Sequence, residues 1–359
     1  MTPFKLHRIC TIMEPEEGNE WEVEGVLNPA VTRGPDGDLY IFPRMVAKNN
    51  YSRIGIARVK FNEAGDPVGV ERLGIALEPE ADYEKRPNGG GGCEDPRITY
   101  VEPVEHYIMT YTAYGQYGPR IAMARSKDLF NWERLGLVHY SPYNGIDFNG
   151  IDNKDASFFP VDLPSPYNHT SIAMLNRPLF PLTRPEEIVK NDDVHQSDEQ
   201  RESIWISYFN LKKGKNTSLE SAKFTSHHCL AHPVYPWENI KIGAGAPPIL
   251  TKHGWLLVYH GVQKHEDCTK DQPAFYYSAG VMILSETEPQ KILYHSPDPI
   301  LIPDLPEEKI GTVGNVVFPT GTDRRDDIGQ PNRIDVYYGM ADDRIGVAKM
   351  QIPDRLPDG

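Results

Sequence analysis

The sequence predicts an all-β protein, and a five-bladed β-propeller is the architecture that it favours. Five segments place a turn before a short strand rich in aromatic and β-branched residues, namely 36–42, 105–111, 169–175, 253–259 and 333–338. They recur at intervals of roughly 65 to 85 residues, which suits four-stranded units joined by loops of variable length. The 32 prolines and 30 glycines supply the turns between strands, and long amphipathic helical patterns are scarce.

The spacing leaves a second architecture open, a two-sheet sandwich with an appended domain. All-β folds often remain one unit at such a length, and no low-complexity linker divides the chain. We therefore expect a single catalytic domain over residues 1–359. The acidic stretch near residues 185–200 is expected to form an exposed insertion between the third and fourth units.

Composition limits the partners and the compartment. The formal net charge of −14 argues against nucleic acid or an anionic membrane as a partner, so an anionic ligand would need a local basic pocket. The four cysteines, Cys10, Cys93, Cys229 and Cys268, contain no CxxC pair and suggest neither a zinc site nor a disulfide framework. No apolar signal region or bilayer-length run is found. We expect a cytoplasmic protein without a membrane contact.

A glycine-rich turn over residues 89–97 is the most informative local motif. It places Glu94, Asp95 and Arg97 where the chain enters a strand. Glycines permit a close backbone approach, and an acid held beside an arginine at the rim of a sheet suits the protonation of a leaving oxygen. The alternative is a surface turn with an ordinary ion pair.

Several further motifs occur in a fixed order over nearly the whole chain. They are LNPA (27–30), FPR (42–44), EDPRIT (94–99), NKDA (153–156), FP (159–160), LNRP (175–178), KIGAGAPPI (241–249), GWLLVYHG (254–261), GNVVFP (314–319) and YYGMAD (337–342). In this set the sequence resembles glycoside hydrolase family 130, the inverting β-mannoside phosphorylases and their hydrolytic relatives. The resemblance also implies a five-bladed propeller.

The resemblance implies that Asp95 is the catalytic acid and that its proton passes through a hydroxyl of the mannose. Phosphate is already anionic and needs no general base, so one protein carboxyl suffices for phosphorolysis. Water as the nucleophile would require a second carboxylate. Asp155, Glu238 and Glu266 are the candidates for that base, while Glu94 can serve structurally.

By the same resemblance, Arg177, Lys241 and His260 form a phosphate-binding set, and Tyr277 is a hydroxyl donor in that pocket. A guanidinium can bind two phosphate oxygens at once, and a lysine adds a compact charge. Taken alone, Lys241 could be an exposed loop lysine and His260 a buried core histidine.

Two positions depart from the family pattern. Asn176 stands where the phosphorylases usually carry a histidine. A further arginine expected between Arg177 and Lys241 has no motif match, although Arg201 lies near. Because the hydrolytic members have lost parts of the basic set, retention of Arg177, Lys241 and His260 favours phosphorolysis.

Sugar recognition is assigned to polar side chains from several units. The resemblance implies that the mannose is held by Asn28, Arg44, Arg97, Lys154, Asp155 and Asp342. Buried groups of this kind reject sugars that leave them unpaired. Three tyrosines after the acid-bearing strand either stack on the acceptor sugar or pack in the core: Tyr111, Tyr114 and Tyr117.

We therefore expect an inverting, glycosyltransferase-type phosphorylase that converts a β-mannoside and inorganic phosphate into α-mannose 1-phosphate and a shortened sugar. Neither a cofactor nor a metal is expected, and the family is compatible with a homo-oligomer. The alternatives are an inverting β-mannosidase, which is a glycosidase on the same fold, and a non-catalytic carbohydrate-binding propeller. The motifs do not specify the linkage that is cleaved or the acceptor sugar.

Overall fold

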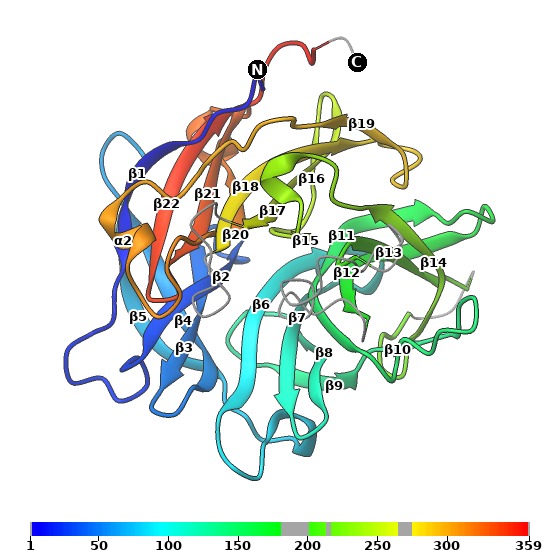
Figure 1. Ribbon diagram of the computed structural model, residues 1–359, viewed down its shortest axis with the longest axis horizontal. Helices are drawn as coiled ribbons and strands as arrows, with labels where there is room; N and C mark the ends of the chain where they lie inside the picture. Colours follow the sequence, from blue (N-terminus) through cyan, green and yellow to red (C-terminus); the bar gives the residue numbers. More distant parts are fainter. Residues whose placement is uncertain (1, 181–200, 213–216, 265–274, 358–359) are drawn as a thin grey trace.

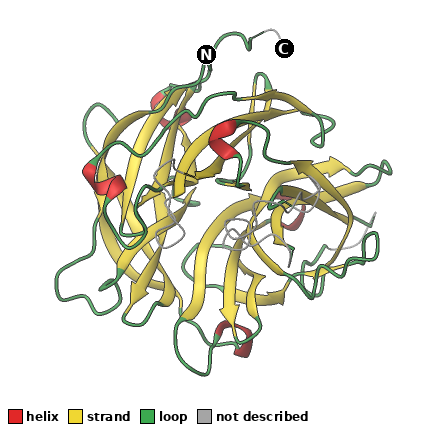
Figure 2. Ribbon diagram, in the orientation of Figure 1, coloured by secondary structure: helices red, strands yellow, loops and turns green. Residues whose placement is uncertain are grey.

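Strands make up almost all of the regular structure. The computed structural model describes residues 2–180, 201–212, 217–264 and 275–357. Across these ranges the helical parts are short 3₁₀ turns and the four-residue helix α2 (Pro306–Lys309), as Figure 2 shows. This confirms the all-β prediction. The acidic insertion near 185–200 lies outside the described residues. No helix in the described ranges is long and apolar enough to span a bilayer.

The strands form four hydrogen-bonded sheets (Figure 1). One contains β1 (His7–Met13), β22 (Arg344–Gln351), β21 (Arg333–Met340) and β20 (Val317–Arg324). A second contains β10 (His139–Tyr140), β14 (Lys223–Ala231), β13 (Ile204–Asn210), β12 (Thr170–Leu179) and β11 (Asp152–Pro164). A third contains β15 (Lys241–Ala244), β17 (Gly254–Lys264), β18 (Phe275–Leu284) and β19 (Ile292–His295), with β16 (Ile249–Thr251) paired to β17.

The remaining sheet has eight strands. In order they are β2 (Gly25–Arg33), β3 (Leu39–Ala47), β4 (Tyr51–Phe61), β6 (Gly91–Val101), β7 (His106–Gly115), β8 (Gly118–Ser126) and β9 (Glu133–Leu137), with β5 (Pro67–Leu77) paired to β4. Only two residue pairs, Tyr51 with Gly91 and Ser52 with Gly92, join β4 to β6. The two halves of this sheet pack on each other, and the Phe42 and Trp132 rings meet edge to face at 6.0 Å.

The five predicted strands are all present and become β3, β7, β12, β17 and β21. Each lies inside its sheet with a neighbour on both sides. Along β21 every residue is buried, because neighbouring sheets cover both faces. Apolar side chains are therefore required at successive positions rather than at alternate ones. This explains why runs of aromatic and β-branched residues could be recognised in the sequence.

Five strands, β2, β6, β11, β15 and β20, lie nearest the middle of the view in Figure 1. Contacts link β20 to β2, β2 to β6, β6 to β11 and β11 to β15. In three of these strands the pairing register shifts at a residue with positive φ: Asn28 at 45°, Asp95 at 48° and Asp155 at 55°. Bulges of this kind redirect a side chain, and here they occur at three predicted site residues.

Candidate active site

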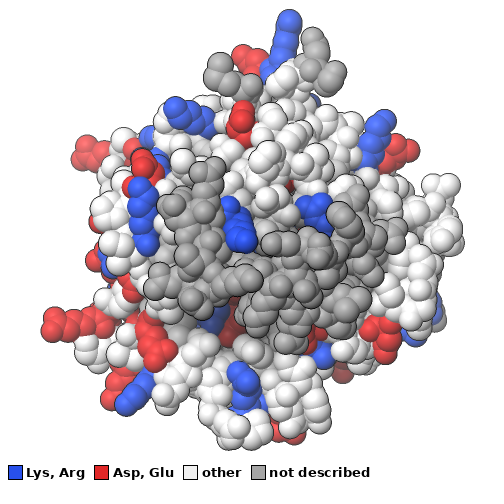
Figure 3. Space-filling model, viewed as in Figure 1, with Lys and Arg blue, Asp and Glu red and all other residues white. Residues whose placement is uncertain are grey.

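One cavity of about 190 Å³ is lined by all the predicted site residues except Arg97. These residues come from three of the four sheets and from the turn between β21 and β22. Val313, Val316 and Phe318 complete the lining. On the face shown in Figure 3, basic atoms are visible near the middle, and many of the acidic atoms lie toward the rim. The cavity therefore gathers four cations on an acidic protein, with three aspartates among them.

Asp95 lies on β6, where the glycine-rich turn enters the sheet. Its Oδ1 accepts a hydrogen bond from Asn28 Nδ2 at 2.9 Å and lies 3.4 Å from a terminal nitrogen of Arg44. The other terminal nitrogen of Arg44 binds Glu94 Oε1 at 2.9 Å. Lys154 Nζ is 3.8 Å from Glu94 Oε2. Glu94 therefore holds two cations in place around Asp95, which agrees with the structural role expected for it.

Asp342 forms a second carboxyl group near Asp95. Burial raises the pKa of Asp342 to about 6, and the Asp95 carboxylate adds to the rise while Arg44 opposes it. Burial also acts to raise the pKa of Asp95, but the charges of Arg44, Lys154 and Arg97 outweigh it and hold that pKa below its usual value. Below about pH 6 the two carboxyl groups thus share a proton that belongs to the pair.

Arg97 does not face the cavity. It is 1% exposed, and it donates hydrogen bonds to the backbone carbonyls of Asp95 (3.0 Å), Pro96 (3.0 Å) and Gly245 (2.6 Å). One terminal nitrogen of Arg97 has no hydrogen-bond partner among the described residues, and the prediction that Arg97 holds a sugar hydroxyl stays a prediction. Its guanidinium fixes the backbone that carries Asp95 and ties β6 to the loop after β15.

The predicted phosphate-binding residues line the same cavity. Arg177 Nε donates to Asp155 Oδ2 at 2.6 Å, and another guanidinium nitrogen pairs with Glu202 Oε2. Lys241 Nζ lies 3.9 Å from the same Glu202 oxygen and 5.4 Å from the centre of the Tyr277 ring. The cations that could hold an anion are thus already oriented by two buried carboxylates.

His260 is fully buried, and neither ring nitrogen has a hydrogen-bond partner among the described residues. Burial lowers the pKa of His260 to about 3, so the ring is neutral. The 3.8 Å approach of its Nε2 to Asp155 is then too long for a hydrogen bond and is not an ion pair. A neutral imidazole with unpaired nitrogens can donate one hydrogen bond to a ligand in the cavity. The alternative of a satisfied core histidine is wrong.

The carboxylates considered as a general base for hydrolysis differ in whether they line the cavity. Asp155 lines the cavity. Glu238 does not, because its carboxylate accepts hydrogen bonds from Tyr259 (2.6 Å) and from the backbone N–H of Val234 (2.9 Å). Glu266 lies outside the described residues, as do Cys268 and its surroundings. Arg201, considered as a further phosphate ligand, donates to the backbone carbonyl of Asn239 at 2.9 Å.

The tyrosines that follow the acid-bearing strand behave differently from one another. Tyr111 is buried and donates to Glu84 at 2.5 Å, so it packs in the core. Tyr114 faces the guanidinium of Arg86 at 4.6 Å and Lys154 at 5.8 Å. Tyr117 is 75% exposed. None of the three lines the cavity.

Glu202 was missed in the sequence because it matches no motif. It comes directly after the acidic insertion, in the interval where a further cation was expected. In the described residues no group of three or more His, Cys, Asp or Glu side chains is arranged to hold a metal ion.

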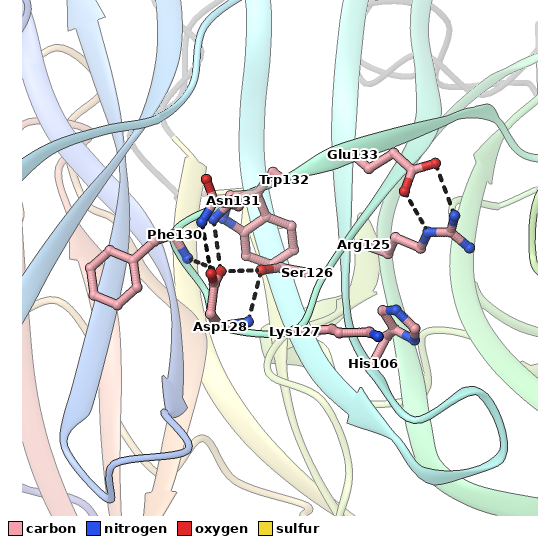
Figure 4. Close-up of a pocket in the computed structure, with 9 residues that line it drawn as sticks. All are labelled: His106, Arg125, Ser126, Lys127, Asp128, Phe130, Asn131, Trp132 and Glu133. Atoms are coloured by element: carbon pink, nitrogen blue, oxygen red, sulfur yellow. Dashed lines mark hydrogen bonds and ion pairs between the residues drawn. The ribbon is translucent and has the colours of Figure 1, made fainter.

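A larger hollow of about 530 Å³ lies at β7–β9, away from this site (Figure 4). Several of its polar groups are bonded to one another. Arg125 pairs with Glu133, with both nitrogen–oxygen distances at 2.9 Å. Asp128 accepts hydrogen bonds from the backbone N–H groups of Phe130 (2.9 Å) and Asn131 (2.8 Å). This arrangement stabilises a turn, and none of the predicted site residues lines this hollow.

The sequence model of a known family, described as β-1,4-mannooligosaccharide phosphorylase, matches residues 6–356. The chain belongs to glycoside hydrolase family 130. A 1,2-β-oligomannan phosphorylase from Thermoanaerobacter sp. (strain X514) is 31% identical and covers 98% of this chain and 99% of its own length. A β-1,2-mannobiose phosphorylase from the same organism is 29% identical over 97% of this chain and 98% of its own.

Solved structures share the fold of this family 130 chain. A β-1,2-mannobiose phosphorylase from Listeria innocua in complex with β-1,2-mannobiose superposes with a TM-score of 0.67 at 21% identity and covers 98% of this chain and 97% of that chain. A protein described as a putative glycosidase from Bacteroides thetaiotaomicron gives 0.71 at 22% identity, covering 98% and 97%.

Proposed function

We propose that this family 130 member is an inverting β-mannoside phosphorylase that transfers a mannosyl group from a β-mannoside to inorganic phosphate. The observation that carries the proposal is the single cavity in which Asp95 and a separate set of cations and hydrogen-bond donors meet. A glycosidase needs an acid, but only a phosphorylase needs a dedicated anion site as well. The names of the full-length relatives support the same activity.

In this mechanism the mannose lies against Asn28, Arg44, Lys154 and Asp342. The proton held by the Asp95 and Asp342 pair passes from Asp95, through a mannose hydroxyl, to the leaving oxygen. Phosphate attacks the anomeric carbon from the opposite face, which gives α-mannose 1-phosphate and the shortened sugar. No protein base is required, because phosphate arrives as an anion.

Phosphate is held by Arg177, Lys241, His260 and Tyr277. Arg177 and Lys241 supply charge, while the neutral His260 and the Tyr277 hydroxyl supply hydrogen bonds. Phosphate is the co-substrate, and no cofactor takes part in the proposed chemistry. The cytoplasmic location and a homo-oligomeric assembly stay predictions.

We further propose that the fold is a five-bladed propeller and a single catalytic domain. The eight-stranded sheet would then be two blades, β2–β5 and β6–β9, joined by the two-residue bridge between β4 and β6. Face-to-face packing of its two halves supports this division.

Hydrolysis is the second candidate. It is favoured by one observation, which is that Asp155 brings a carboxylate to the cavity wall. Its Oδ2, however, is bound to Arg177 Nε at 2.6 Å, which makes it a weak base.

Incubation with short β-mannosides, with and without phosphate, separates the two activities. We expect mannose 1-phosphate that requires phosphate. A rate independent of phosphate, with free mannose as the product, would reject the proposal in favour of hydrolysis.

A further inference from the structure

Glu202 lies between the two cations of the anion pocket. Its side chain is 3% exposed, its Oε2 pairs with Arg177, and the same oxygen lies 3.9 Å from Lys241 Nζ. The backbone carbonyl of Glu202 accepts a hydrogen bond from Ile242 N–H at 3.1 Å, which fixes the residue beside β15. Glu202 is not part of the cavity lining itself, but an anion bound to both Arg177 and Lys241 would lie close to its carboxylate.

The charges around this point nearly cancel. Arg177 (β12) and Lys241 (β15) are positive, and so is Arg97 (β6), which binds backbone carbonyls but whose charge still acts on Asp155. Burial acts to raise the pKa of Asp155 (β11), but Arg177 and the other cations hold that pKa well below its usual range, so Asp155 is negative beside Glu202. His260 (β17) is neutral, and its neighbour Tyr277 (β18) adds only a hydroxyl. A fully deprotonated dianion would meet two carboxylates for two cations.

We propose that Glu202 determines which oxyanion the pocket accepts, by admitting anions that carry a proton and disfavouring those that do not. This inference rests on the proposed phosphorylase function and deepens it. A phosphate or arsenate monoanion can donate its O–H to the Glu202 carboxylate while its other oxygens accept from Arg177 and Lys241. Hydrogen bonds between a hydroxyl and a carboxylate are short and strong.

Sulfate has the same shape but no proton at neutral pH. Its oxygens can only accept hydrogen bonds, so the one that faces Glu202 is repelled and the carboxylate loses solvation without gaining a donor. The pocket should therefore discriminate phosphate from sulfate even where both are dianions, because hydrogen phosphate keeps one O–H and sulfate has none. The KM for phosphate should also rise as pH passes through the second ionisation of phosphate, which lies near neutrality, because the dianion brings one more negative charge to a place where two carboxylates already face the two cations.

The test compares wild type with Glu202→Gln and Glu202→Asp. Glutamine keeps the size of the side chain but removes the charge and can donate a hydrogen bond to an oxyanion. Aspartate keeps a proton acceptor. Glu84→Gln is the matched control, because Glu84 is also buried and pairs with Arg134 at 2.9 Å outside the cavity. Phosphate and sulfate binding are measured by calorimetry, and sulfate inhibition is measured in the phosphorolysis assay across pH.

We expect wild type and Glu84→Gln to prefer phosphate over sulfate by at least about tenfold at neutral pH, because a repelled or unpaired buried group costs that much in affinity. Glu202→Gln should lose most of this preference, become inhibited by sulfate, and show a KM for phosphate that changes less with pH. Glu202→Asp should retain part of the preference, which separates the effect of the carboxylate from a loss of fold.

Equal binding of both anions by wild type, or an unchanged preference in a folded Glu202→Gln, would overturn the inference while leaving phosphorolysis intact. Conversely, wild type that binds phosphate selectively but releases only free mannose would reject the proposed function and leave the role of Glu202 standing. Wild type that binds neither anion would reject both.

Discussion

Replacing Asp95 with asparagine removes a proton donor while keeping the size of the side chain. The amide oxygen of Asp95→Asn can still accept the hydrogen bond from Asn28, and Arg44 keeps its partner Glu94. Arg97 binds the backbone carbonyl of residue 95 and is not disturbed. The substitution therefore tests the chemistry of one group with little effect on its surroundings.

The expected loss follows from the missing proton. General acid catalysis contributes about 10²- to 10⁴-fold, which corresponds to about 3 to 5 kcal/mol of transition-state stabilisation. The structural cost is smaller. The contact between Asp95 and Arg44 is long at 3.4 Å, so the free energy of unfolding should fall by at most about 3 kcal/mol, the upper value for a hydrogen bond to a charged group.

The assay compares two substrates. A β-mannobiose needs its leaving oxygen protonated, whereas an aryl β-mannoside with an acidic phenol does not. Asp95→Asn should lose the full factor on the disaccharide and much less on the aryl mannoside. Asp152→Asn is the control, because Asp152 lies on β11 outside the cavity and pairs with Arg120. Near wild-type turnover of the disaccharide, or equal losses on both substrates, would refute Asp95 as the acid.

Three further outcomes are expected. Lys241→Ala should raise the KM for phosphate about tenfold or more with little change in melting temperature. Arg177→Ala should also destabilise the fold by about 3 to 5 kcal/mol, because it leaves two buried carboxylates unpaired. Steady-state kinetics and thermal denaturation distinguish the two variants. At saturating phosphate, kcat/KM on a disaccharide should fall as pH rises above about 6, since the Asp342 pKa is raised to about 6 and the shared proton is lost above it. Asp342→Asn should shift this fall to lower pH, because Asp95 then loses the neighbouring charge that helps to retain its proton. An unshifted pH profile in that variant would contradict the pairing of the two carboxyl groups. Gly92→Ala should lower the melting temperature and the yield of folded protein, because Gly92 has φ of +112° and a Cβ there would collide with a backbone carbonyl of β4. An unchanged denaturation curve would contradict this expectation and show that the turn adjusts to the added methyl group.

The strands could be predicted because of where they lie. A strand covered on both faces, such as β21, must be apolar at every position, and runs such as that around Tyr337 and Tyr338 stand out in the sequence. The number of sheets could not be predicted in this way. The bridge between β4 and β6 depends on two backbone pairs near Gly91 and Gly92, which no side-chain pattern reports.

The site could be predicted as a set of residues but not as a geometry. Alternation along a strand would place the side chains of Asp95 and Arg97 on the same face, yet the register shifts between Glu94 and Arg97 and the two side chains separate. Asn28 and Asp95 both precede proline, a position that favours extended backbone, but both have positive φ. Glu202 was missed because its importance comes from the two cations around it.

The pairing of β1 with β22 affects when the protein can become active during its synthesis. β1 leaves the ribosome before its partner strand and the adjacent Asp342, which are made only after β2 to β21. Until then β1 has no β22 to pair with, and such unpaired edges promote aggregation of nascent chains. Contacts this distant in sequence also form slowly. Expression conditions should therefore change the fraction of molecules that reach the native state, and each molecule that does reach it should be fully active.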